Sequence, residues 1–232
     1  MPILLQPAYV LHRRAYRETS FIVELFSLDH GRLSVIAKGV RRGKASQQGL
    51  LQAFIPLLIS WSGQGELMTM THVEAHGEIK NLRGDCLFAG FYLNELLMNL
   101  LQKWDPHQDL FRAYQNTLQV LQLNHLEQKT LRSFEKKLLI ELGYGLWSSQ
   151  NSFLPECHYR FILEQGFLLY DRADIFHLPN NVFSGENLLR ITNEDWDEAS
   201  LQDAKRLMRF VIASLMGSRS LNSRRLFTQL VE

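Results

Sequence analysis

Residues 20–38 read SFIVELFSLDHGRLSVIAK and decide how the first third of the chain folds. Apolar residues alternate with polar ones on both sides of His30-Gly31, as Phe21, Val23, Leu25, Leu33, Val35 and Ala37 show. A period of two is typical of a strand with one buried face, and a short glycine-containing segment between two such runs suits a hairpin turn. The stretch therefore predicts two antiparallel strands, with Arg32 and Lys38 on the face opposite the buried residues.

More strands are expected around this hairpin. YVLHR near the start, FIPLLISW at 54–61 and ELMTMTHVEA at 66–75 carry the same apolar pattern, and SGQG forms a turn between the last two. Several short strands in so few residues favour a closed barrel, because closure removes exposed sheet edges. We predict a five-stranded, oligonucleotide-binding (OB) barrel over residues 1–80.

The pattern changes from period two to helical spacing near Leu82. Helices are predicted over 88–104, 108–123 and 126–143, and their short connections indicate a bundle. The first is expected to end at Asp105-Pro106 and the third at Gly143-Tyr144-Gly145. The fold class is thus α+β, with a mostly helical domain over residues 81–232.

Two later segments complete this helical domain. Residues 147–180 are irregular and contain one hairpin, YRFILEQGFLLY, that we expect to turn at Gln165-Gly166. Residues 200–217 form a strong helix, with Ser200 as its predicted N-cap and Asp203 in its first turn. The acidic run NEDWDEAS before this helix is interpreted as serving the helix dipole or a solvated face rather than a Mg²⁺ site.

Positive charge is unevenly distributed, although the 232 residues carry a formal net charge of only +1. One basic region lies in the first 44 residues and a second follows Lys205. A polyanion is bound largely through neutralised phosphates, so these regions predict a nucleic-acid surface. Its candidate residues are Arg13, Arg14, Arg32, Lys38, Arg41, Arg42, Lys44, Arg206, Arg209, Arg224 and Arg225.

The glycine-rich stretch AKGVRRGKASQQG, at 37–49, invites comparison with a phosphate-binding P-loop. That motif needs four residues between its glycines and Ser or Thr after the lysine, but three residues separate Gly39 from Gly43 and Ala45 follows Lys44. A P-loop is excluded. A mobile, solvated charge run remains the alternative to a DNA-binding loop. The aromatic rings that could stack on bases are more readily explained as core residues, and none is assigned to stacking; they are Tyr9, Tyr16, Phe26 and Phe54.

The sequence offers no support for catalysis, a metal or a cofactor. Cys86 and Cys157 are the two cysteines, no Cys-x-x-Cys occurs, and the common hydrolase and metalloprotease motifs are missing. We therefore expect a protein that is not an enzyme, without cofactor or metal. Neither a secretory leader nor a membrane-length apolar run is found, so a cytoplasmic location without membrane association is expected.

The third predicted helix carries a mixed surface. Lys129, Arg132 and Lys136 recur beside an apolar stripe that includes Phe134. Such a surface suits a peptide that is both acidic and hydrophobic. Ordinary solvated cations bordering a core face explain the pattern equally well.

Five motifs in order resemble the RecO family of bacterial DNA repair proteins, from about Tyr9 to Leu226-Phe227. They are Glu18-Thr19-Ser20; Gly31-Arg32-Leu33 with Ala37-Lys38-Gly39; Tyr92-x-Asn94-Glu95-Leu96-Leu97; Leu131-Arg132-x-Phe134-Glu135; and Leu142-Gly143-Tyr144-Gly145. Each motif is weak alone, but their order and distances are specific. Many members carry a four-cysteine zinc site in the region of 147–180, whereas this chain offers Cys157 there and resembles the zinc-free branch.

The resemblance implies an OB barrel joined to a helical domain. It also implies that the protein is a non-catalytic recombination mediator. Such a protein binds single- and double-stranded DNA, anneals complementary strands, and works with RecR to load RecA onto strands coated by single-stranded DNA-binding protein (SSB). It would belong to the RecFOR pathway. Arg132 matches the arginine with which family members hold the acidic SSB tail, and the expected location is the cytoplasm, on the nucleoid.

Two other functions share some of these features. An OB-fold protein that binds RNA or tRNA would show the same electrostatics, and competition between RNA and DNA separates the two. A nuclease would cleave a labelled oligonucleotide in the presence of Mg²⁺.

Overall fold

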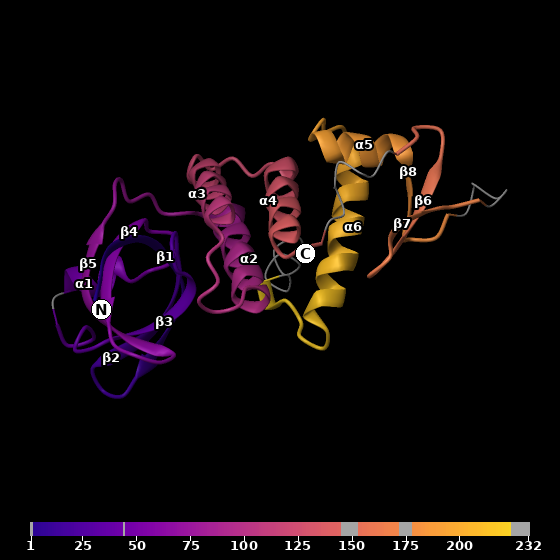
Figure 1. The fold of residues 1–232 in the computed structure, drawn as a ribbon. Coiled ribbons are helices and arrows are strands. Elements are labelled where there is room, and N and C mark those ends of the chain that lie inside the picture. Colours follow the sequence, from indigo (N-terminus) through magenta and orange to yellow (C-terminus); the bar gives the residue numbers. More distant parts are fainter. Residues whose placement is uncertain (1, 44, 145–152, 172–177, 224–232) are drawn as a thin grey trace. The chain divides into compact units, whose positions relative to one another are not determined.

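The computed structural model describes residues 2–43, 45–144, 153–171 and 178–223, and its fold begins with the predicted barrel (Figure 1). Its strands are β1 (Ile3–Tyr16), β2 (Ser20–Ser27), β3 (Gly31–Ala37), β4 (Leu57–Ser62) and β5 (Leu67–Ala75). They close in the order β1-β2-β3-β5-β4, with the short helix α1 (Ala45–Leu50) between β3 and β4. The α+β fold with an N-terminal five-stranded barrel is confirmed.

The predicted period of two is the one that fills the barrel. Val23, Leu25, Leu33 and Val35 are fully buried inside it, together with Trp61 from β4. β2 and β3 pair antiparallel with Val23 opposite Val35, so the alternation of both strands points to the same interior.

The turn between β2 and β3 requires a glycine at Gly31. Its φ is +65°, in the left-handed region, and a Cβ at this position would overlap the backbone of Asp105. The connection after α2 therefore packs directly on the turn. Trp104 N–H donates to the Arg32 carbonyl at 2.9 Å and continues this contact along β3.

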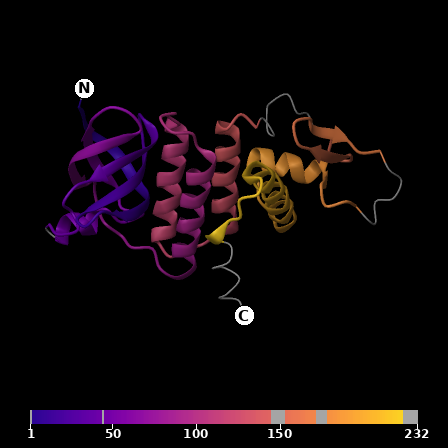
Figure 2. The same cartoon turned by 90° about the horizontal axis from the view of Figure 1, so that it is seen from below.

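Two helices, α2 (Gly84–Leu100) and α3 (Gln108–Gln122), pack beside the barrel (Figure 2). The contact is aromatic: Tyr9 and Phe26 lie on the outside of the barrel, yet they are only 4% and 0% exposed, because Phe111 and Tyr114 of α3 cover them. Burying such large rings contributes strongly to this contact.

Asn94 of α2 connects the helices to β1. The register of β1 shifts between Val10 and His12, which leaves Leu11 without an opposing residue. The Asn94 amide donates to the Leu11 carbonyl at 2.9 Å, and its oxygen accepts from the Tyr114 hydroxyl. One buried side chain thus satisfies a barrel carbonyl that the bulge leaves outside the ladder.

The chain divides into two compact units: Met1–Leu126 with Leu221–Glu232, and Glu127–Ser220. Glu95 of α2 ties the later segment to the first unit, since its carboxylate accepts from the backbone N–H groups of Asn222 and Ser223. In the second unit, α4 (Gln128–Glu141), α5 (Gly185–Asn193) and α6 (Glu198–Met216) accompany a small sheet. Its strands β6 (His158–Ile162), β7 (Gly166–Leu169) and β8 (Val182–Ser184) lie in the order β7-β6-β8.

The predicted hairpin exists as β6 and β7, but its turn falls slightly earlier than expected. Ile162 pairs with Gly166, so Leu163–Gln165 form the loop, and Glu164 and Gly166 both have positive φ. β8 and α5 were not predicted from the sequence.

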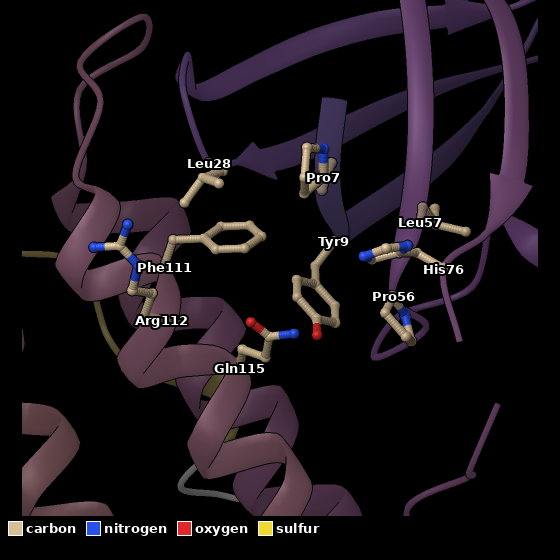
Figure 3. Close-up of a pocket in the computed structure, with 10 residues that line it drawn as sticks. Pro7, Tyr9, Leu28, Pro56, Leu57, His76, Phe111, Arg112 and Gln115 are labelled. Atoms are coloured by element: carbon tan, nitrogen blue, oxygen red, sulfur yellow. The ribbon is translucent and has the colours of Figure 1, made fainter. Parts of the chain in front are cut away.

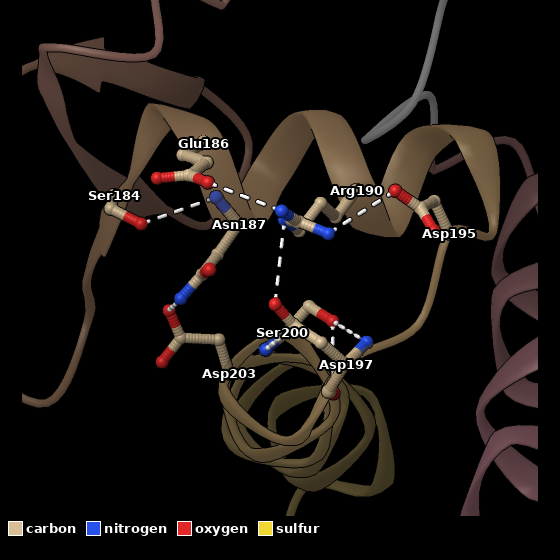
Figure 4. Close-up of polar contacts among 8 residues, drawn as sticks. All are labelled: Ser184, Glu186, Asn187, Arg190, Asp195, Asp197, Ser200 and Asp203. Atoms are coloured by element: carbon tan, nitrogen blue, oxygen red, sulfur yellow. Dashed lines mark hydrogen bonds and ion pairs between the residues drawn. The ribbon is translucent and has the colours of Figure 1, made fainter.

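The start of α6 differs from the prediction, because Asp197 and not Ser200 is the N-cap. The Asp197 carboxylate accepts from Ser200 N–H at 2.7 Å, and the Ser200 hydroxyl accepts from Asp197 N–H at 2.9 Å (Figure 4). Ser200 therefore occupies the N3 position of a capping box. Asp203 lies beyond the first turn, where it accepts from Asn187 and Arg206.

Candidate nucleic-acid interface

The end of the barrel where β1 finishes, β2 begins and β3 finishes gathers the first basic region. Tyr16 pairs with Ser20, and Phe21 pairs with Ala37, so the segments after β1 and β3 lie beside each other. We call the cations here the cationic rim; its members are Arg13, Arg14, Arg17, Lys38, Arg41 and Arg42.

The loop after β3 is attached to the turn after β1 by its backbone. Arg41 N–H donates to the Thr19 carbonyl at 2.9 Å, and the Arg41 guanidinium donates to the Arg17 carbonyl at 2.9 Å. The glycine-containing loop, which the sequence could equally present as a mobile charge run, is held against the barrel at this point. Arg41 is therefore positioned by main-chain contacts through both its backbone and its guanidinium.

Two rim arginines share an aromatic support. The Arg13 and Arg41 guanidinium carbons lie 5.0 and 5.9 Å from the centroid of the Phe21 ring, and Arg13 also donates to the Gln48 carbonyl at 2.9 Å. Carbonyls and rings orient a guanidinium without cancelling its charge. Donors left over remain available to an external anion.

The rim is positive because it contains few acids. Arg42 lies 3.2 Å from the Glu18 carboxylate, in a pair whose side chains are 71% and 81% exposed, and such exposed pairs are weak. Within the described ranges, the other rim cations have no carboxylate at ion-pair distance. Arg17 also belongs to the rim, although it is not among the candidates predicted from the sequence. Its position directly after β1 is the feature of the sequence that could have indicated this.

The structure does not bring Arg32 to this rim. Its side chain is 16% exposed and lies 3.7 Å from the Glu24 carboxylate. Lys103, from the segment after α2, donates to Ser34 Oγ at 2.6 Å and covers the same strand face. The outward side of β3 predicted for Arg32 is thus occupied by another part of the chain, whereas Lys38, just past the strand, is exposed.

The second basic region lies partly on α6. The Arg206 guanidinium stacks on Phe183 at 4.5 Å and donates to Asp203 Oδ1 at 2.7 Å and to the Val182 carbonyl at 2.8 Å. Arg209 is exposed. Lys44, Arg224 and Arg225 lie outside the described residues.

The three cations predicted for a peptide site all lie on α4 and all have acidic neighbours. Lys129 pairs with Glu127, and Arg132 pairs at 2.9 Å with Glu135. Lys136 donates to the Thr192 carbonyl at 2.7 Å and to Glu194 at 3.1 Å. Lys129 is exposed, whereas the Arg132 and Lys136 side chains are only 11% and 9% exposed.

Arg190 organises the acidic run before α6. Its guanidinium lies 3.3 Å from Glu186, 3.2 Å from Asp195 and 3.4 Å from Asp197, as Figure 4 shows. The hydrogen bond with Glu186 raises the Arg190 pKa, and the hydrogen bonds with Ser200 lower the pKa of Asp197. These acids are used for helix capping and ion pairing. No cluster of three or more potential metal ligands occurs in the part of the chain that the structure describes.

A small pocket of about 200 Å³ lies where the barrel meets α3 (Figure 3). Tyr9, Phe111 and Gln115 line it, and the Gln115 amide points toward the Tyr9 hydroxyl. Burial raises the pKa of Tyr9 to about 12, against an opposing hydrogen bond with Gln115. The pocket is smaller than the roughly 300–1,000 Å³ typical of small-molecule sites.

The helices in the described ranges are all too short or too polar to cross a membrane.

Comparisons with known proteins agree with the fold. The family model described as "Recombination protein O N terminal" matches residues 1–78, and "Recombination protein O C terminal" matches 83–154. Three relatives bear the name DNA repair protein RecO. That of Coxiella burnetii is 44% identical over 97% of both chains, that of Methylococcus capsulatus 45% over 97% of this chain and 93% of the relative, and that of Dechloromonas aromatica 42% over 98% and 96%.

A barrel of this order and this sequence identity over nearly the full length lead to one conclusion: the chain belongs to the RecO family and has a role in DNA repair and recombination.

Proposed function

We propose that this chain is a non-catalytic recombination mediator that binds single- and double-stranded DNA and anneals complementary strands. With RecR it helps to load RecA onto SSB-coated strands, in the cytoplasm on the nucleoid. The observation that carries the proposal is the cationic rim, where Arg13 and Arg41 are positioned by carbonyls and the Phe21 ring. Their charge is retained for phosphates, which they contact without reading bases.

Annealing follows from the same electrostatics. Two complementary strands repel each other as polyanions, and cations that neutralise phosphates on both strands reduce this repulsion. The reaction needs no catalytic group. Mixing labelled complementary oligonucleotides, bare or coated with SSB, at two salt concentrations tests the proposal directly. Accelerated annealing that weakens with salt is expected, and cleavage of the strands in Mg²⁺ or the absence of acceleration would refute it.

The proposed SSB contact involves Lys129, Arg132 and Lys136 of α4. An acidic tail would pair with the exposed Lys129 first and would compete with Glu135 and Glu194 for the other two cations. Arg132→Lys keeps a cation beside Glu135 but removes the planar fork that holds a carboxylate. We expect it to lower affinity for an acidic tail peptide more than affinity for bare DNA. Equal losses of affinity for the peptide and for DNA would assign Lys129, Arg132 and Lys136 to the DNA surface.

The alternative is an OB-fold protein that binds RNA or tRNA, and it shares the same rim. Competition between RNA and single-stranded DNA of equal length and sequence distinguishes the two proposals. A clear preference for RNA would favour the alternative.

A further inference from the structure

A groove along α6 in the second unit combines cations with an exposed aromatic ring. Its volume is about 790 Å³, and its wall includes Lys205, Arg206, Arg209, Phe210, Ala213 and Ser214. The helical period places Lys205 and Arg209 one turn apart, and Arg206 and Phe210 likewise. The groove therefore presents charge on two successive turns beside one ring.

The charge of this groove is positive. Arg206 is partly neutralised by Asp203, but Lys205 and Arg209 are exposed and have no carboxylate partner within the described ranges. None of the residues that line the groove is acidic. Its electrostatics thus favour an anionic occupant.

The Phe210 ring is exposed but held in place. It is 41% exposed and meets Phe161 edge to face, with the ring centroids 6.0 Å apart. The small residues Ala213 and Ser214 line the next turn of the groove. A fixed ring between cations is the combination with which single-strand binders stack a base while neutralising its neighbouring phosphates.

We propose that this groove is a single-strand site in the second unit, in which Phe210 stacks on an unpaired base and Lys205 and Arg209 contact the flanking phosphates. The inference rests on the proposed function and adds to it a place for a second strand. A duplex keeps its base faces stacked on one another, so the ring should discriminate between single and double strands.

The test uses the full chain with the rim silenced by replacing all six of its cations with glutamine, so that the remaining DNA binding reports the groove; the variants are Arg13→Gln, Arg14→Gln, Arg17→Gln, Lys38→Gln, Arg41→Gln and Arg42→Gln. Phe210→Leu is compared with Phe91→Leu, because both rings are 41% exposed and the groove beside Phe91 contains no Lys or Arg. Anisotropy of a labelled oligo-dT and of a duplex of equal length gives both affinities.

Phe210→Leu is expected to weaken residual oligo-dT binding by about fivefold or more, with little change for the duplex, and Phe91→Leu is expected to change neither. Lys205→Gln with Arg209→Gln should flatten the salt slope by about 1.4. Two results would overturn the groove proposal while the rim proposal stands. One is that Phe210→Leu loses affinity equally for the duplex and the single strand, and the other is that the silenced chain binds no DNA. Failure of the unsilenced chain to bind DNA would instead refute the proposed function.

A second measurement does not depend on the variants. Irradiation of the wild-type chain with an oligonucleotide containing 5-iodouracil should cross-link the peptide that carries Phe210. Cross-links confined to the barrel would overturn the proposal. So would groove variants that lose an acidic peptide but keep oligo-dT, since that result would assign the groove to a protein partner.

Discussion

Removal of three rim cations should change the salt dependence of DNA binding in a calculable way. Arg14, Lys38 and Arg41 have no carboxylate partner at ion-pair distance within the described residues, so each should release counterions when it meets a phosphate. For single strands the logarithmic salt slope changes by about 0.7 per contact, so the triple Gln variant should bind with a slope less steep by about 2. Between about 50 and 200 mM salt, the wild type should lose about 20-fold more affinity than the variant.

The assay is anisotropy of a labelled oligo-dT over that salt range. The control removes three cations of the same unit outside the rim, through Lys80→Gln, Arg83→Gln and Arg112→Gln. Both variants have the same net charge, and screening over about 10 Å at 0.1 M salt limits the effect of distant charges. An unchanged slope in the rim variant, or an equal change in the control, would refute the reasoning. Circular dichroism should show the same fold in both, because the Arg41 N–H to Thr19 bond is between backbone atoms.

Three further predictions concern stability. Arg132→Ala should lower the unfolding free energy by about 3–5 kcal/mol in urea titrations, because it removes the cation beside the fully buried Glu135, and Arg132→Met with Glu135→Met should restore most of the loss. Burial raises the pKa of Tyr9 to about 12, so the hydroxyl releases its proton more readily in the unfolded chain than in the folded one. The contribution of this group to the unfolding free energy is therefore complete below pH 10 and is lost as pH rises from 10 to 12. Urea titrations at pH 9 and 11 should show a smaller drop for Tyr9→Phe than for the wild type, and an identical drop would contradict this. Gly31→Ala should cost more than about 1 kcal/mol, since φ is +65° and the new Cβ would overlap Asp105; an unchanged melting curve would show that the turn relaxes freely.

The barrel could be predicted from the sequence because its signal is local. Val23 and Val35 belong to strands whose period of two directly reports which face is buried. α5 and β8 were missed because they contain few residues, and short elements depend on the packing around them more than on their own pattern. Asp197 was not recognised as the cap since its partner Ser200 is itself a common N-cap residue.

The sequence predicted that the candidate site is rich in cations, but it did not predict how those side chains are arranged. The excess of cations is visible in the sequence, but the burial of Arg32 depends on Glu24 and on Lys103, which covers the same strand face. Contacts over such sequence distances leave no periodic signal. Likewise, Phe210 can be recognised as a candidate binding residue only when the groove around it is known.

The aromatic outer surface of the barrel constrains how such a protein can evolve. Tyr9 and Phe26 are hidden only because Phe111 and Tyr114 cover them. A gene fragment that encodes the strands without α3 would yield a domain with an exposed aromatic patch on its surface, and such a domain would be prone to aggregate. Recombination between genes should therefore conserve the strands and both neighbouring helices as one heritable block, and a breakpoint near residue 80 should be selected against.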